Sequence, residues 1–154
     1  MPVDTTFLDT IEKTVRSDDG WDAALDHILE RFGADSGTIH LLAGDGLLHL
    51  RSASRGIPPV VIETVRTVPI GKGMAGLAVE RRQPVNACNI QTDTSGDVRP
   101  GARVTGLQGS IVVPILRDDR AVGALGIANY GERIFTEEEA DALMAIGRVL
   151  ARAL

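Results

Sequence analysis

Two pairs of strand-like segments, each joined by a short turn, constrain this fold more than any other feature of the sequence. Residues 38–42 and 47–51 are mostly apolar and flank an Asp45-Gly46 dipeptide, which is typical of a β-hairpin turn. Residues 110–116 and 121–128 form the second pair. Because the two strands of a hairpin run antiparallel, the sequence predicts an antiparallel sheet.

Helical patterns precede and interrupt these strands. Two helices are expected within residues 1–33, the first capped by Thr5 or Thr6. The second has apolar residues at intervals of three and four, and Gly33 stands where a helix C-cap is expected. A short helix is expected after Pro58, and Pro69 is expected to end any regular structure there.

The C-terminal segment predicts a helix that begins with a capping box, Thr136 with Glu139. Its apolar residues form two rows rather than one, and a single row suffices to cover a sheet. The second row therefore favours a partner chain, so we expect a homodimer through Leu143, Val149 and Leu150.

This order of elements predicts an α+β fold, an antiparallel sheet of five to six strands with helices on both faces. The length of 154 residues suits one domain. We expect residues 1–33 to form the N-terminal helices, residues 34–135 the sheet with its pocket, and residues 136–154 the C-terminal helix.

Composition excludes several classes of function. The formal net charge of −5 and the presence of only five aromatic rings argue against nucleic-acid binding, which requires positive charge and stacking surfaces. No stretch approaches the roughly 20 apolar residues of a membrane span. The N-terminus shows no secretory signal pattern, so we expect a cytoplasmic protein.

Metal and disulfide chemistry find little support. Cys88 is the only cysteine, and the three histidines, His27, His40 and His49, lack metal-ligand spacing. His40 and His49 alternate with apolar residues on the first strand pair, which predicts that both lie on the solvent face of the hairpin. We therefore expect no metal site, and no motif indicates catalytic residues.

The sequence resembles a GAF domain, a small sensory relative of the PAS fold. The resemblance covers residues 20–154 and rests on blocks in the order of that family, namely residues 34–42, 69–76, 83–85, 109–115, 122–129 and 135–138. It implies a GAF/PAS-like fold and a regulatory domain that binds a small molecule, acting through a homodimer or a partner signalling protein. The ligand, and with it any cofactor, is not identified by this resemblance.

Two regions are candidates for ligand contact. The glycine-rich turn before residue 77 opens a helix whose N–H groups could receive an anion or a carbonyl, or else its glycines only allow tight packing. The loop over residues 91–107 is polar and is expected to cover the sheet as a lid. The predicted ligand-binding residues are Met74, Ala75, Cys88, Asn89, Asp93, Thr94, Arg99 and Arg103.

One branch of the family reduces free methionine sulfoxide with a nucleophilic and a resolving cysteine. At the positions of those cysteines this sequence has Ala75 and Arg103, and Cys88 lies elsewhere. A methionine-(R)-sulfoxide reductase is therefore the disfavoured alternative, and we expect no enzyme. A dimerisation or interaction module without a ligand is the third hypothesis.

Cyclic nucleotides and haem are poorly supported as ligands. Asn129 and Phe135 match the family's cyclic-nucleotide motif, but Tyr130, Glu139 and Ala140 replace its charged residues. None of the five rings falls within residues 71–75 or 85–109, where the resemblance places the pocket. We therefore expect a small ligand held mainly by backbone groups and side chains of the lid.

Overall fold

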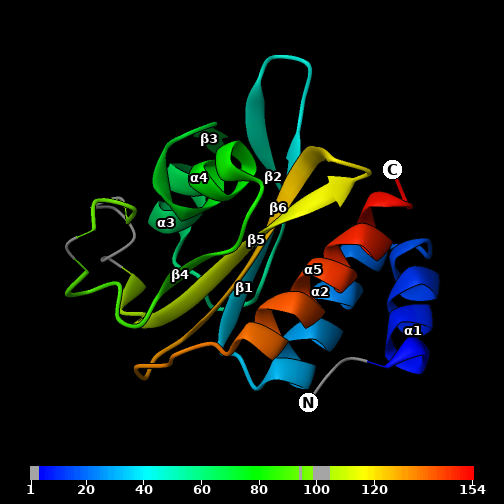
Figure 1. Cartoon of the computed structure of the whole chain (residues 1–154), viewed down its shortest axis with the longest axis horizontal. Coiled ribbons are helices and arrows are strands. Elements are labelled where there is room, and N and C mark those ends of the chain that lie inside the picture. Colours follow the sequence, from blue (N-terminus) through cyan, green and yellow to red (C-terminus); the bar gives the residue numbers. More distant parts are fainter. Residues whose placement is uncertain (1–3, 94, 99–104) are drawn as a thin grey trace.

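The computed structural model describes residues 4–93, 95–98 and 105–154. Five helices and six strands follow one another along these residues (Figure 1). They are α1 (Thr5–Val15), α2 (Gly20–Phe32), β1 (Ser36–Leu42), β2 (Leu47–Ala53), α3 (Pro59–Val65), β3 (Thr67–Pro69), α4 (Gly73–Arg81), β4 (Val85–Ala87), β5 (Gly109–Arg117), β6 (Arg120–Asn129) and α5 (Glu137–Ala151).

The strands form one antiparallel sheet in the order β3-β2-β1-β6-β5-β4. This confirms the predicted α+β class and both hairpins, and Gly46 has the positive φ that the first turn requires. The three-residue strand β3 is an addition, because a regular run was not expected there. Pro69 is tolerated in it since β3 is an edge strand and needs no second partner.

Helices cover both faces of the sheet, as predicted (Figure 1). Helices α2 and α5 pack on one face, and α1 lies against both of them as an outer layer. The largest core cluster lies on this side and is built around Ile28, Ile39, Leu125 and Ile146. Helix α4 packs on β5 and β6 from the other face. Since strand residues alternate between the faces, β1, β5 and β6 each present every second side chain to α4 and its surroundings.

The two apolar rows of α5 are both buried within the chain, which corrects the reason given for a dimer through this helix. Leu143, Val149 and Leu150 are each at most 2% exposed. The second row meets α1 of the same chain, because α1 covers the face of α5 that the sheet leaves open. These three residues offer no surface to a second copy, so a homodimer stays a prediction without an assigned interface.

Helix ends follow local chemistry. The capping box is confirmed: the hydroxyl of Thr136 accepts from the backbone N–H of Glu139, whose carboxylate accepts in return. Gly33 ends α2 in the left-handed conformation, as predicted. The cap of α1 was predicted wrongly, since Asp4 accepts from the N–H of Phe7 and Thr5 is the first helical residue.

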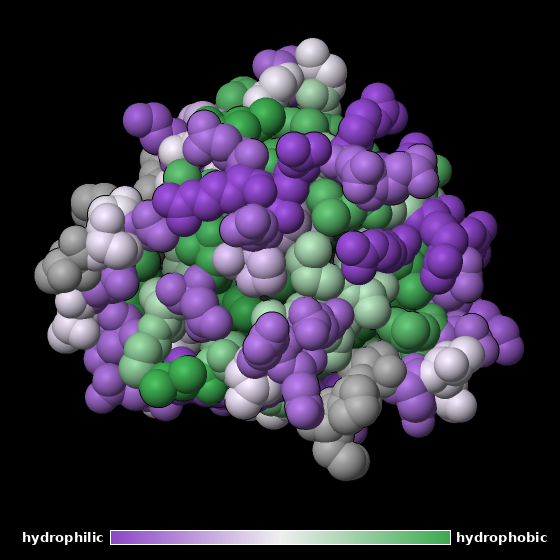
Figure 2. Space-filling model, viewed as in Figure 1, coloured by the Kyte–Doolittle hydropathy of each residue, from purple (hydrophilic) through white to green (hydrophobic). Residues whose placement is uncertain are grey.

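The face in Figure 2 mixes hydrophilic and hydrophobic residues without a broad apolar band. Among the described residues, the large exposed hydrophobic side chains belong to separate parts of the chain, namely Val60, Ile70, Tyr130, Ile134 and Leu154. No helix in the described ranges combines the length and the hydropathy that crossing a membrane demands.

Candidate functional site

A cavity of about 300 Å³ lies between the sheet and the elements that cover its α4 face. Its floor is formed by alternate residues of β1, β5 and β6, such as Thr38, Val112 and Ala128. Helix α3 contributes Val61, and the start of α4 contributes Met74. This volume lies at the lower end of the range of ligand pockets, about 300–1,000 Å³.

Most of the lining is aliphatic. Besides the floor and helix residues, the cavity is lined by apolar side chains of the loops, namely Ile57, Pro58, Ile90, Val98 and Leu107. The sequence had predicted contacts with backbone groups and polar lid residues, so this aliphatic lining is a difference from that prediction. It arises because residues far apart in the sequence each place one apolar side chain toward the same space.

One aromatic residue belongs to the lining, which also differs from the sequence interpretation. Tyr130 follows β6 and is 57% exposed, so it lies at the rim of the cavity rather than on its floor. Its backbone N–H donates to the carboxylate of Asp35, another rim residue. A ligand stacked between rings is not favoured by this arrangement, because a single exposed ring supplies one side of a stack at most.

The start of α4 forms one wall of the cavity. Two roles were predicted for its glycine-rich turn, namely tight packing and contact with a ligand. Gly76 packs so tightly that an added Cβ would lie 2.3 Å from the carbonyl oxygen of Pro69, which requires a glycine. Gly73, Met74 and Ala75 line the cavity. Its N-cap residue, Lys72, makes no side-chain capping hydrogen bond within the described residues.

The described parts of the 91–107 loop lie over the cavity. Val98 and Leu107 are buried and line it. Two polar contacts hold the loop. Arg81 of α4 pairs with Asp97 in its middle, with N–O distances of 3.1 and 3.3 Å. The amide of Gln91 donates to the carbonyl of Leu107 at 2.7 Å and joins the two ends. The described parts of the loop therefore occupy the place expected of a lid.

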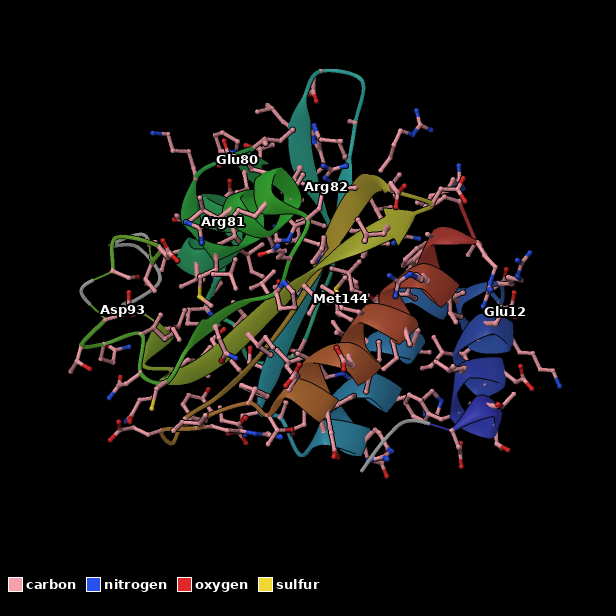
Figure 3. All side chains as sticks on the ribbon, in the orientation of Figure 1. Glu12, Glu80, Arg81, Arg82, Asp93 and Met144 are labelled. Carbon is pink, nitrogen blue, oxygen red and sulfur yellow. The ribbon has the colours of Figure 1, made fainter. Side chains whose placement is uncertain are left out.

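The predicted ligand residues fall into three groups. Met74 and Ala75 line the cavity together. Cys88, Asn89 and Asp93 do not line it: the exposed Cys88 thiol lies 3.8 Å from Glu132, and Asn89 and Asp93 accept from the N–H two residues later. Figure 3 shows Asp93 on the loop at the outer edge of the molecule. The remaining three, Thr94, Arg99 and Arg103, lie outside the described residues.

His40 lies in this site, although the sequence had placed it on the solvent face of the hairpin. It is 3% exposed and lines the cavity, and its Nε2 lies 2.8 Å from the carbonyl oxygen of Val65 at the end of α3. Burial lowers the pKa of His40 below 6.5, although its hydrogen bond to Val65 acts in the opposite direction. The prediction failed because both faces of β1 are covered, so alternation does not identify a solvent face there.

The rim carries two cations, Arg55 and Lys72. Neither makes an ion pair within the described residues, in contrast to Arg81 and Arg133. Asp35 lies on the same rim but is engaged by Asn129 and the N–H of Tyr130. The mouth of the cavity thus presents more available positive than negative charge, in a chain whose net charge is −5.

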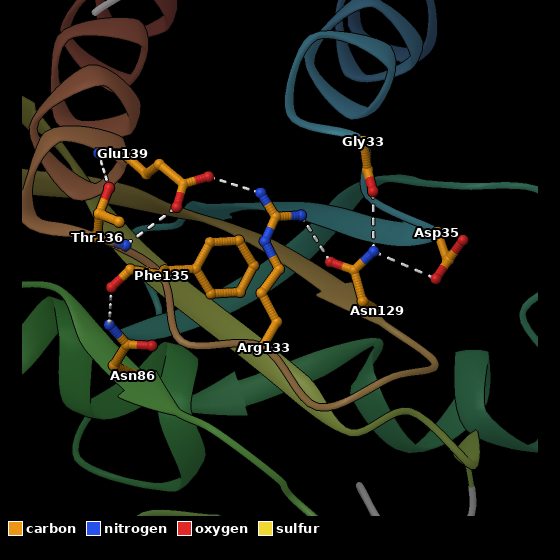
Figure 4. A network of polar contacts seen from close by, with 8 residues as sticks. All are labelled: Gly33, Asp35, Asn86, Asn129, Arg133, Phe135, Thr136 and Glu139. Atoms are coloured by element: carbon orange, nitrogen blue, oxygen red, sulfur yellow. Dashed lines mark hydrogen bonds and ion pairs between the residues drawn. The ribbon is translucent and has the colours of Figure 1, made fainter. Parts of the chain in front are cut away.

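A polar network connects this rim to α5 (Figure 4). Asn129, at the end of β6, donates to Gly33 and Asp35 and accepts from Arg133. Arg133 also pairs with Glu139 at 2.6 Å, and its guanidinium lies 4.3 Å from the centre of the Phe135 ring. Burial acts to raise the pKa of Glu139, but the N–H of Thr136 and the guanidinium of Arg133 outweigh it, so that pKa lies below its usual value. The rim is therefore tied to the first turn of α5.

No three side chains of the usual metal-binding types gather within the part of the chain that the structure describes. Ser110, on the cavity floor, donates to the carbonyl of Ile127. Ser110 and His40 are not hydrogen-bonded to each other, because each is paired with a backbone carbonyl, so they form no nucleophile–base pair.

Known structures of similar fold include a GAF domain, a domain of a sensor kinase protein and a reductase. A GAF domain from an Acinetobacter phosphoenolpyruvate-protein phosphotransferase is 21% identical, with 96% of this chain and 90% of that chain covered and a TM-score of 0.77. A free methionine-R-sulfoxide reductase from Neisseria meningitidis, in complex with its substrate, is 22% identical, with 96% and 85% covered and a TM-score of 0.73. A domain of a predicted two-component sensor histidine kinase protein from Sinorhizobium meliloti is 18% identical, with 88% of each chain covered and a TM-score of 0.69.

At these identities the structures establish a shared fold. No curated protein matches this sequence. The model of the GAF domain family matches residues 18–154, which include the whole sheet, the cavity and α5. This chain therefore belongs to the GAF domain family.

Proposed function

We propose that this domain senses a small molecule, which it binds in the cavity between the sheet and the α3, α4 and lid segments. GAF domains occur in sensory and regulatory proteins, among them the kinase and phosphotransferase relatives above. The single observation that carries the proposal is a cavity of about 300 Å³ whose lining comes from six helices and strands and from the loops between them. Packed interiors contain few spaces of this size, which makes this one the natural candidate for a binding site.

Ligand binding would act on the surrounding elements by shifting the population of their arrangements. The lid is attached to α4 through Arg81 and Asp97, so a ligand that contacts Val98 and Met74 favours the closed arrangement of both. The rim is connected to α5 through Asn129 and Arg133. In this proposal the domain is cytoplasmic and signals through a partner protein or a homodimer, using a surface other than the buried rows of α5.

The test is native mass spectrometry of the protein purified from its own host. We expect a co-purified small molecule, and we expect its loss in an Ala128→Leu variant, whose longer side chain fills part of the cavity floor. Ala43→Leu is the matched control, because it adds the same atoms at an exposed position of the β1–β2 turn. A molecule retained equally by all three proteins would place the ligand elsewhere. No adduct, together with no binding of any screened compound, would favour an interaction module without a ligand.

The proposal includes no catalytic step. The reductase chemistry needs a thiolate and a resolving cysteine, whereas the single cysteine of this chain, Cys88, is exposed and outside the cavity lining. We expect no reduction of free methionine-R-sulfoxide above background, by the wild type or by Cys88→Ser. Turnover that depends on Cys88 would overturn this part of the proposal.

A further inference from the structure

The polar groups on the cavity floor indicate what kind of ligand it accepts. Strand β1 directs Ser36, Thr38 and His40 to the cavity face, since side chains two residues apart share a face. The Ser36 hydroxyl is paired with that of Ser54. Nε2 of His40 faces the carbonyl oxygen of Val65, and a carbonyl can only accept, so Nε2 carries the hydrogen. In the neutral ring, Nδ1 is then a hydrogen-bond acceptor.

This Nδ1 atom has no partner in the described part of the protein. The only side-chain hydrogen bond of His40 there uses Nε2. Within the same residues, every fully enclosed side-chain nitrogen or oxygen has a hydrogen-bond partner. Because Nδ1 has none, it is not fully enclosed and must face open space. The His40 ring is buried and lines the cavity, so this open space is the cavity. The lowered pKa of His40 keeps the ring neutral at pH 7 and preserves the acceptor.

The hydroxyl of Thr38 likewise makes no hydrogen bond within the described residues. Thr38 and His40 are two residues apart on one strand, about 6.6 Å along it. That spacing allows one polar atom between them to hydrogen-bond with both. A hydroxyl fits best, because it can donate to Nδ1 and accept from the threonine. An ammonium group fits poorly, since a cation in an aliphatic cavity without an unengaged carboxylate bears a large desolvation cost.

We propose that the cavity binds a compact, uncharged, mainly apolar molecule that carries a hydroxyl group, with the hydroxyl between Thr38 and His40 and the apolar body against Val61, Met74 and Leu107. This inference rests on the proposed function and deepens it. A cavity of 150 Å³ is known to hold benzene, so about 300 Å³ admits roughly a dozen non-hydrogen atoms. Phenols, bicyclic alcohols and similar compounds belong to this class.

The probes are 2-naphthol and 2-fluoronaphthalene, which have nearly the same shape and differ in the hydroxyl. Binding is followed by the NMR signals of ¹³C-methyl-labelled methionines. Met74 lines the cavity and reports binding there, whereas Met144 belongs to α5 on the opposite face of the sheet and serves as an internal control (Figure 3). We expect 2-naphthol to shift the Met74 signal saturably and to leave Met144 unchanged, with 2-fluoronaphthalene binding about tenfold more weakly.

Two variants test the assigned partners. Thr38→Val removes the hydroxyl and keeps the shape, and His40→Gln removes Nδ1 while retaining an N–H for the Val65 carbonyl. We expect each to reduce the preference for 2-naphthol by about threefold or more, with little change for 2-fluoronaphthalene. Equal binding of both probes to the wild type would overturn the hydroxyl assignment and leave a ligand-binding cavity. If neither probe shifts Met74, the inference is wrong, and a co-purified molecule of another class would then still support the proposed function.

Discussion

Ala128→Leu tests whether the cavity under the lid has room for a larger side chain. Ala128 is 7% exposed and lines the cavity, and it belongs to the same apolar cluster as Ile90, Val98 and Leu107. Leucine adds three carbon atoms, each about as large as a water molecule of ~30 Å³, so the addition occupies about 90 Å³ of the available 300 Å³. The side chain can therefore enter existing space without displacing the sheet.

The magnitude follows from two opposing terms. Burying three methylene-sized groups stabilises by at most about 2.4 kcal/mol, at ~0.8 kcal/mol each. Adjusting the lid side chains costs about 1–3 kcal/mol when a larger residue is inserted. We expect the two to offset each other, so the free energy of unfolding changes by less than about 1 kcal/mol. Ala24→Leu is the comparison: Ala24 is fully buried in the core cluster on the other face of the sheet and does not line the cavity, so we expect only the cost of about 1–3 kcal/mol.

The assay is urea unfolding of the three proteins, followed by circular dichroism, with the free energy extrapolated to water. We expect Ala128→Leu to match the wild type closely and Ala24→Leu to be clearly less stable. If both variants lose the same stability, the α4 face of the sheet is as densely packed as the α2 face. The cavity, and the function proposed for it, would then be refuted together.

Three further predictions concern other parts of the molecule. Arg133→Met should lower the free energy of unfolding by about 2 kcal/mol, since it removes two charge-assisted hydrogen bonds and a ring contact. Urea unfolding measures this against Arg120→Met, the same substitution at an exposed arginine. The pKa of His40 is lower in the folded protein than its unfolded value of 6.5, so the unfolded chain binds more protons between these two values. Lowering the pH through this window should therefore reduce the free energy of unfolding, and His40→Gln should show a flatter pH dependence over it. Leu150→Asp should unfold the chain, at a cost of about 4 kcal/mol or more, rather than dissociate a dimer; light scattering that shows a folded monomer formed from a dimer would contradict this.

Local features were largely predictable from the sequence. The Asp45-Gly46 turn, the capping box of Thr136 and Glu139, and the left-handed Gly33 depend on residues a few positions apart, so the chemistry that specifies them is visible in a short stretch of chain. Together with the hairpins they led to the correct class and sheet direction. The cap of α1 shows the limit of such reasoning, since Asp4, Thr5 and Thr6 are all chemically suitable and adjacent.

Features that depend on how distant helices and strands pack against one another were not predictable from the sequence. The two rows on α5 indicated that two surfaces cover this helix, and that was right. Which surface lies on the second row, α1 of the same chain or another copy, depends on the path of residues more than 100 positions away.

The candidate site shows the same difference between features set by a short stretch of chain and features set by long-range packing. Contiguous residues were enough to predict an antiparallel α+β domain that resembles the GAF family, with a glycine-rich turn beside its pocket. The burial of His40 on the cavity floor depends instead on long-range packing, and so does the aliphatic lining that Val61, Val98 and Leu107 provide. Alternation along β1 assigns a residue to a face, but what lies on that face is decided by α3, α4 and the lid folding over it.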